Sequence, residues 1–139
     1  MSYLDTKQAL IQKLLATSIT GITSADIAFE NNDFNPTSKS KYIAAYFIPA
    51  TSDSMGKKIN SGDEHRGIFQ VSVFIKLNSG NYDNDQLQII DDILSGFQYG
   101  SQSVYNAQTV CILESTVNSG SENESWFKRD ISIDYLTII

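Results

Sequence analysis

The sequence predicts an α+β fold: a single-layer, mainly antiparallel sheet of four to five strands with two helices packed on one face. Two segments have the apolar period of amphipathic helices, and several short apolar runs alternate as strands do. Neighbouring strands are joined by turns, which favours antiparallel pairing over parallel strands with crossover helices. The length of 139 residues is typical of one domain, so we expect a single domain over residues 1–139.

The first helix is expected in residues 2–17. Its apolar side chains recur every three to four residues, as in an amphipathic helix. Ser2 and Asp5 resemble a capping box, which places the start of the helix near residue 2. The apolar stripe comprises Leu4, Ile11 and Leu15, with Leu10 and Leu14 beside it.

The clearest strand lies in residues 67–77, where Phe69, Val71 and Val73 alternate with mostly polar positions. Pro36 and its polar neighbours predict a loop over residues 31–40. Other apolar runs predict strands at residues 41–49, 107–118 and 126–139, with a short one at 25–30.

The second helix follows the clearest strand. Residues 78–85 supply a turn and acidic side chains at the helix start, which suit the positive end of the helix dipole. Gly96 or Gly100 can end the helix. Its apolar stripe, expected to lie on the sheet, comprises Leu87, Ile90, Leu94 and Phe97.

A long polar loop at about residues 50–65 separates two strands and is expected to be mobile. It has no periodicity and is longer than a hairpin needs, which is typical of functional loops. Lys57 and Lys58 stand against Asp63 and Glu64, so the loop can meet a partner of mixed charge. A solvated loop without a partner is the alternative.

Trp126 and Phe127 begin the last strand and must point to opposite faces of the sheet. One of them is therefore expected either at an interface, where aromatic residues are enriched, or under a helix or loop. Phe74, on the otherwise polar side of its strand, raises the same question.

Charge and composition exclude several classes of function. Ten Lys and Arg against sixteen Asp and Glu give a net charge of -6, which disfavours general binding to nucleic acid. The single Cys111 has apolar neighbours and is expected to be a buried hydrophobe, as suits a reducing compartment. The sequence shows neither a signal peptide nor a run of eighteen apolar residues, so we expect no membrane association.

No motif predicts catalysis, a cofactor or a metal. His65 is the only histidine, and the sequence has no HExxH, CxxC or GxSxG spacing. Gly56 and Lys57 lack the rest of a phosphate-binding loop. Three acidic pairs are expected to be solvated, although general acid–base or metal-binding roles stay open for Asp91 and Asp92, Asp63 and Glu64, and Glu122 and Glu124.

The order of these segments resembles the tail terminator proteins of long-tailed bacteriophages and prophages. The segment FNPTSKSKYIAAYFIP is similar to that family's approach to its first main strand. Arg66 and Gly67 open GIFQVSVFI, which resembles the family's Arg and Gly before a strand of this pattern. The last strand, from Trp126 through Arg129 to Tyr135, completes the likeness over nearly the whole chain.

This resemblance implies a non-enzymatic virion protein, made in the host cytoplasm, that caps the tail tube as a hexameric ring. Such a ring stops addition of tube protein and presents a surface to a head-completion or neck protein, while phage DNA passes through its lumen without specific binding. The residues then expected at partner or subunit contacts are Lys57, Lys58, Asp63, Glu64, Arg66 and Trp126. A neck or head-to-tail connector subunit, or a carboxylate-dependent enzyme, are the alternatives.

Overall fold

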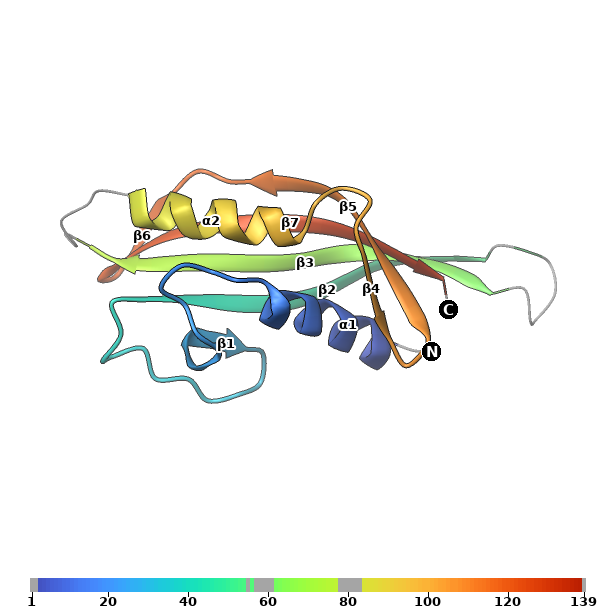
Figure 1. The fold of residues 1–139 in the computed structure, drawn as a ribbon, viewed down its shortest axis with the longest axis horizontal. Helices are drawn as coiled ribbons and strands as arrows, with labels where there is room; N and C mark the ends of the chain where they lie inside the picture. Colours follow the sequence, from blue (N-terminus) through green and yellow to red (C-terminus); the bar gives the residue numbers. More distant parts are fainter. Residues whose placement is uncertain (1–2, 55, 57–61, 78–83, 139) are drawn as a thin grey trace.

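Seven strands form one sheet that curls around two helices in the computed structural model, which describes residues 3–54, 56, 62–77 and 84–138. The strand order is β1-β2-β3-β7-β5-β4, and β6 pairs with β7 (Figure 1). The helices are α1 (Tyr3–Ala16), the 3-10 helix η1 (Ser24–Asp26) and α2 (Asn84–Gly96). The strands are β1 (Ile27–Phe29), β2 (Lys41–Ser54), β3 (Asp63–Lys76), β4 (Gln102–Tyr105), β5 (Gln108–Val117), β6 (Ser121–Asn123) and β7 (Trp126–Ile138).

The prediction of a single-layer sheet of four to five strands is wrong. The sheet has seven strands and curls into a half-barrel, with β1 parallel to β2 and the other described pairs antiparallel. Strands β4 and β6 have only four and three residues, too few to show alternation in a sequence. Register shifts at Pro49/Thr51 and Ile112/Ser115 are the bulges that bend strands, and no sequence pattern marks them.

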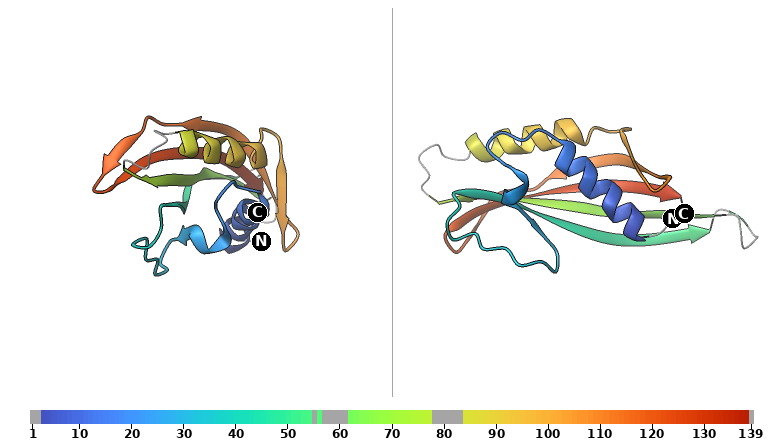
Figure 2. Two further views of the ribbon diagram at one scale, coloured as in Figure 1. Left: turned by 60° about the vertical axis from the view of Figure 1, so that its left-hand side comes forward. Right: turned by 60° about the horizontal axis from the view of Figure 1, so that its bottom comes forward.

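One face of the sheet shares a core with both helices, which lie inside the curl (Figure 2). On β3 the buried residues of this face include Val71 and Val73. Across the sheet, Val71 lies opposite Ala45 of β2 and Ile131 of β7, which are also buried. The alternate residues of these strands face the other way, onto a surface that neither helix covers.

Helix α1 does not bury the stripe expected from the sequence. Leu10 and Leu14 are fully buried together with Ala9, whereas Leu4 is 64% and Leu15 is 42% exposed. The spacing of Leu4 and Leu15 fits a helix period as well as that of Leu10 and Leu14 does. Periodicity alone therefore could not decide which of the two stripes faces the sheet.

Helix α2 buries most of the expected stripe, since Ile90 and Phe97 are buried and Leu94 packs against the core. Ile89, Ile90 and Ile93 are buried, whereas Leu87 lies at the edge of the contact and is 36% exposed. The remaining buried residue of the helix is polar: the Gln86 side chain is fully buried. A polar residue on the core face does not belong to an apolar pattern, so the sequence predicted Leu87 and not Gln86 at this place.

Strands β2 and β3 continue into most of the segment expected to be a loop. Pairing runs on to Ser54 with Asp63, so residues 50–54 and 63–65 are strand and not loop. Strand β7 pairs with β3 as far as Glu64, so only the last pair of this extension, Ser54 with Asp63, lies beyond β7 (Figure 1). We call Pro49–Ser54 with Asp63–Gly67 the hairpin arm. The centre of the expected loop, residues 57–61, lies outside the described residues.

Candidate partner-binding surfaces

The hairpin arm carries three of the residues expected at a contact. Asp63 and Arg66 are exposed and Glu64 is half-buried. The Arg66 Nε atom donates to Glu64 Oε1 at 2.6 Å, so these two charges already form an ion pair on one side of the arm. Lys57 and Lys58 lie outside the described residues, so the bipolar charge pattern expected for the loop stays a prediction.

The root of the arm is built from side chains with few polar partners. His65 is buried beneath the Tyr3 ring, with the ring centroids 5.0 Å apart, and its Nε2 lies 3.1 Å from Ser52 Oγ. Neither His65 Nδ1 nor the Tyr135 hydroxyl has a hydrogen-bond partner among the described residues. Burial, with a smaller contribution from Tyr3, raises the pKa of Tyr135 to about 12. His65 and Tyr135 thus belong to the packed interior where the arm joins the rest of the sheet.

Trp126 belongs to an aromatic cluster at the opposite end of the sheet. The Tyr42 ring stacks on Phe74 with centroids 4.5 Å apart and an interplanar angle of 6°. Trp126 meets Tyr42 edge-on at 4.9 Å, and the Phe34 ring lies 5.1 Å from the Tyr42 ring. Phe74 is buried in this cluster, whereas Trp126 and Tyr42 are half-buried. Burial raises the pKa of Tyr42 above its usual value.

The loop that brings Phe34 to this cluster is held by an ion pair. Lys39 Nζ lies 2.7 Å from Asp26 Oδ1, and this hydrogen bond, with others from Thr23, lowers the pKa of Asp26. The loop thereby places Phe34 against Tyr42 of the cluster. Trp126 is half-buried beside Tyr42, and its expected role at an interface stays a prediction.

The arm and the aromatic cluster are separate surfaces. Lys76 pairs with Trp126 at one end of β3, and Glu64 pairs with Ile138 at the other. Arg66 and Lys76 are ten positions apart, which corresponds to about 33 Å along a strand. A contact at the arm and a contact at Trp126 are thus expected to involve different partners or different parts of one large partner.

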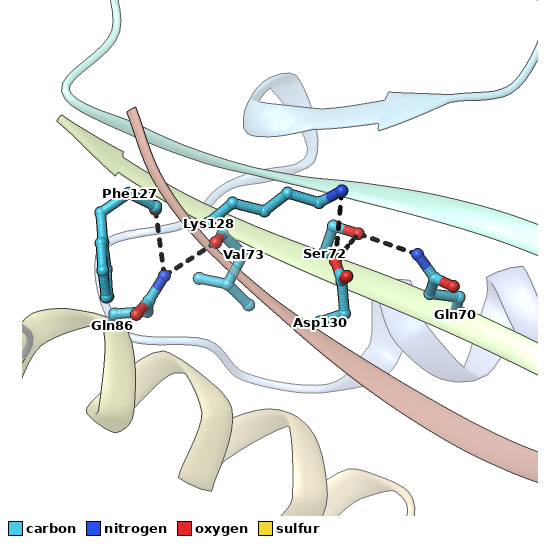
Figure 3. A network of polar contacts seen from close by, with 7 residues as sticks. All are labelled: Gln70, Ser72, Val73, Gln86, Phe127, Lys128 and Asp130. Atoms are coloured by element: carbon cyan, nitrogen blue, oxygen red, sulfur yellow. Dashed lines mark hydrogen bonds and ion pairs between the residues drawn. The ribbon is translucent and has the colours of Figure 1, made fainter. Parts of the chain in front are cut away.

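Between these two surfaces, the uncovered face of the sheet carries a polar network (Figure 3). Ser72 Oγ donates to Asp130 Oδ1 at 2.6 Å and accepts from Gln70 Nε2 at 3.3 Å. Lys128 Nζ lies 3.6 Å from the same Asp130 oxygen. Ser72 is fully buried by these neighbours although no helix lies over it. The two charged residues at the centre of the face, Lys128 and Asp130, are therefore paired with each other.

In the acidic pair of α2, one carboxylate is held by a hydrogen bond and the other is exposed. Asp92 Oδ2 accepts the Thr20 backbone N–H at 2.8 Å, and this bond lowers the pKa of Asp92. Asp91, beside it on α2, is exposed. Within the described residues, no three His, Cys, Asp or Glu side chains are grouped closely enough to hold a metal ion.

Sequence reasoning overlooked Tyr42 as a neighbour of Trp126 and Phe34 as a neighbour of Tyr42. Tyr42 lies on the outward side of β2, opposite Phe74, and that shared alternation was the available signal. Cys111 is half-buried and lies on the uncovered face next to Leu136, not in the core as expected. The helices of the described part are too short or too polar to cross a membrane.

Comparison with known proteins confirms the family resemblance found in the sequence. The family described as phage tail terminator protein matches residues 6–135. No curated protein matches the chain. One similar solved structure has a TM-score of 0.73 and 19% identity, covering 99% of this chain and 96% of that one. Another, from the virion of a native gene transfer agent particle, has a TM-score of 0.64 and 13% identity, covering 99% of this chain and 100% of that one.

Proposed function

The chain belongs to the phage tail terminator family, and we propose that six copies form a ring that caps the tail tube and stops its polymerisation. Membership of this family makes the chain a structural protein of the phage virion. In the proposed role the ring also offers a surface to a head-completion or neck protein. This role depends on binding surfaces and on the shape of the ring, and it requires no catalysis.

The family match carries this proposal because it spans residues 6–135 and thus nearly all of the fold. It includes both strands of the hairpin arm, the aromatic cluster and both helices. The likeness to a chain of a gene transfer agent particle supports the fold alone, since the two sequences share 13% identity.

The hairpin arm is the part of the chain that we propose for contact with the tail tube protein or a neighbouring subunit. Among the described residues, β1 pairs with β2 only at Ile43–Ala45, which leaves the outer edge of β2 without a strand partner further along the arm. Open strand edges and charged side chains are features that assembly contacts use. In this proposal Asp63, Glu64 and Arg66 are described contact residues, and Lys57 and Lys58 extend the contact.

The charge of the chain suits a channel for DNA. A net charge of -6 per copy gives six copies a strongly negative surface, which repels phosphate. Phage DNA would thus pass through the lumen without being held. Assembly of such a virion part is expected in the cytoplasm of the bacterial host.

The experiment that tests this function mixes the purified chain with preformed tubes of the cognate tail tube protein. Pelleting the tubes should bring down the chain until about six copies are bound per capped end, because a ring offers one layer at a tube tip. Sonicated tubes, which have more ends for the same mass, should bind proportionally more. Binding that scales with tube mass instead of the number of ends, or no binding, would contradict capping.

A further inference from the structure

Helix α1 has two apolar sides, of which only one is covered. Leu10 and Leu14 pack into the core, whereas Leu4 and Leu15 are exposed on the side that faces away from the sheet. Ile11, half-buried and partly packed against the core, lies on the same line, because positions separated by seven and eleven residues nearly superpose on a helix. A helix on the surface of a protein normally presents polar residues there. We call Leu4, Ile11 and Leu15 the α1 stripe.

A second apolar surface lies on the uncovered face of the sheet. Ile48 pairs with Ile68 across β2 and β3, and Leu136 pairs with Arg66 one row further along β3. Ile48 is 41% and Ile138 is 48% exposed. Each of these positions alternates with a buried core residue, so they share the outward face. The sheet patch is defined as Ile48, Ile68, Leu136 and Ile138.

These two surfaces face in opposite directions and have rims of complementary charge. Lys7 lies beside the α1 stripe, three positions after Leu4 and four before Ile11. Asp5, the acidic residue of α1, is buried. In the sheet patch, Ile68 lies directly opposite Asp134, while Arg66 is neutralised by Glu64. The rim of the stripe is thus positive and that of the patch negative.

We propose that the α1 stripe of one copy docks on the sheet patch of the next copy, with Lys7 close to Asp134 of that neighbour. This inference rests on the proposed ring and names the contact that would close it. A head-to-tail contact between two different surfaces of one chain generates a ring when its rotation closes. A second copy is the occupant that covers both surfaces at once, since each molecule carries both halves of the contact.

The contact is tested with two double variants at exposed positions, so that the fold is preserved. The stripe variant is Leu4→Lys with Leu15→Lys, and the patch variant is Ile48→Lys with Ile138→Lys. Gln98→Lys and Thr116→Lys are controls at exposed positions outside both surfaces. Circular dichroism verifies that all are folded, and sedimentation velocity measures their mass.

We expect the wild type and both controls to form a species of six 15.4 kDa chains, about 92 kDa, and each double variant to be monomeric. An equimolar mixture of the two double variants retains one intact stripe and one intact patch. It should therefore form dimers and nothing larger. Cys111, beside Leu136 on the same face, should react more slowly with a maleimide in the assembled wild type than in either variant.

A mixture that stays monomeric, double variants that assemble like the wild type, or a wild type that is monomeric at every concentration would overturn the contact. Tube capping separates this result from the proposed function. Capping by both double variants at the wild-type level would reject the contact and keep the function. If the mixture forms dimers but the wild type does not bind tube ends, the contact is retained and the proposed function is rejected.

Discussion

Gly67 lies directly opposite Tyr135 in the sheet, and a β-carbon at Gly67 would come within 2.6 Å of the Tyr135 hydroxyl oxygen. The same β-carbon would lie 2.6 Å from the carbonyl oxygen of Ile48. The tyrosine ring thus fills the place that a side chain on β3 would take. This packing gives a physical reason for a glycine after Arg66, at the root of the hairpin arm.

Gly67→Ala is expected to destabilise the chain by about 1–3 kcal/mol, the usual cost of forcing an extra methyl into a packed site. Urea denaturation followed by circular dichroism measures the free energy of unfolding. Thr51→Ala, an exposed position on the same arm, should change it by less than about 0.5 kcal/mol. Equal stability of Gly67→Ala and wild type would show that Tyr135 moves aside without cost.

Tyr135→Phe is expected to raise the free energy of unfolding by about 1 kcal/mol at neutral pH, since it removes a buried hydroxyl that no described residue satisfies. The pKa of about 12 in the folded chain lies above the usual tyrosine value of 10.0. Between these values the unfolded chain releases the proton and the folded chain keeps it, so stability falls as pH rises.

The stability difference between Tyr135→Phe and wild type should therefore widen from pH 10 to pH 12. Denaturation at several pH values measures it, and Tyr99→Phe is the control because Tyr99 is 76% exposed. A difference that does not depend on pH would refute the burial of this hydroxyl.

Gln86→Ala is expected to destabilise the chain by about 2–4 kcal/mol, because it removes buried hydrogen bonds and leaves a cavity. The Gln86 amide nitrogen donates to the carbonyl oxygens of Val73 at 2.9 Å and Phe127 at 3.1 Å, which ties α2 to two strands (Figure 3). Gln88→Ala, two positions along the same helix and exposed, is the matched control. Thermal unfolding of both variants compares them, and equal midpoints would contradict the role of Gln86.

Exchange of the charges at Glu64 and Arg66 separates their ion pair from a partner contact. An exposed pair of this kind contributes only about 0.2–1 kcal/mol, so stability should be nearly unchanged in every variant. Arg66→Glu and the double variant Glu64→Arg with Arg66→Glu should both lose binding to tube ends. The double variant keeps the ion pair and the net charge. If it binds tube ends fully, Glu64 and Arg66 stabilise the arm and do not contact the partner.

Trp126 offers a spectroscopic test of the aromatic cluster as a contact. The chain has one tryptophan, so labelling with 5-fluorotryptophan gives a single fluorine resonance. If a partner covers the open side of the ring, this resonance should shift when the chain binds tube ends. The control variant Tyr99→Phe should show the same shift. A resonance that stays unchanged when the chain is bound would show that Trp126 is not part of the contact.

The sequence was sufficient to predict both helices and the clearest strands, because long periodic segments carry a strong signal. Residues 67–77 show why: alternation of Phe69, Val71 and Val73 leaves one arrangement with the apolar side buried. The four residues of β4 and three residues of β6 could not be predicted, since their pairing depends on β5 and β7.

The candidate surfaces were harder to predict than the fold. The sequence places Asp63, Glu64 and Arg66 near one another. It does not show that they lie on paired strands, because that depends on how far β2 and β3 extend. The exposed side of α1 could not be predicted for another reason. Leu4 and Leu15 have the character of core residues, and only the packing of Leu10 and Leu14 shows that they are left outside.

The most direct test of the central claim is the length of tail tubes polymerised with and without this chain, measured by negative-stain electron microscopy. We expect shorter tubes in the presence of the chain, with a ring at one end and no further growth when more tube protein is added. Tubes of unchanged length with bare ends would contradict the proposed function as a tail tube cap.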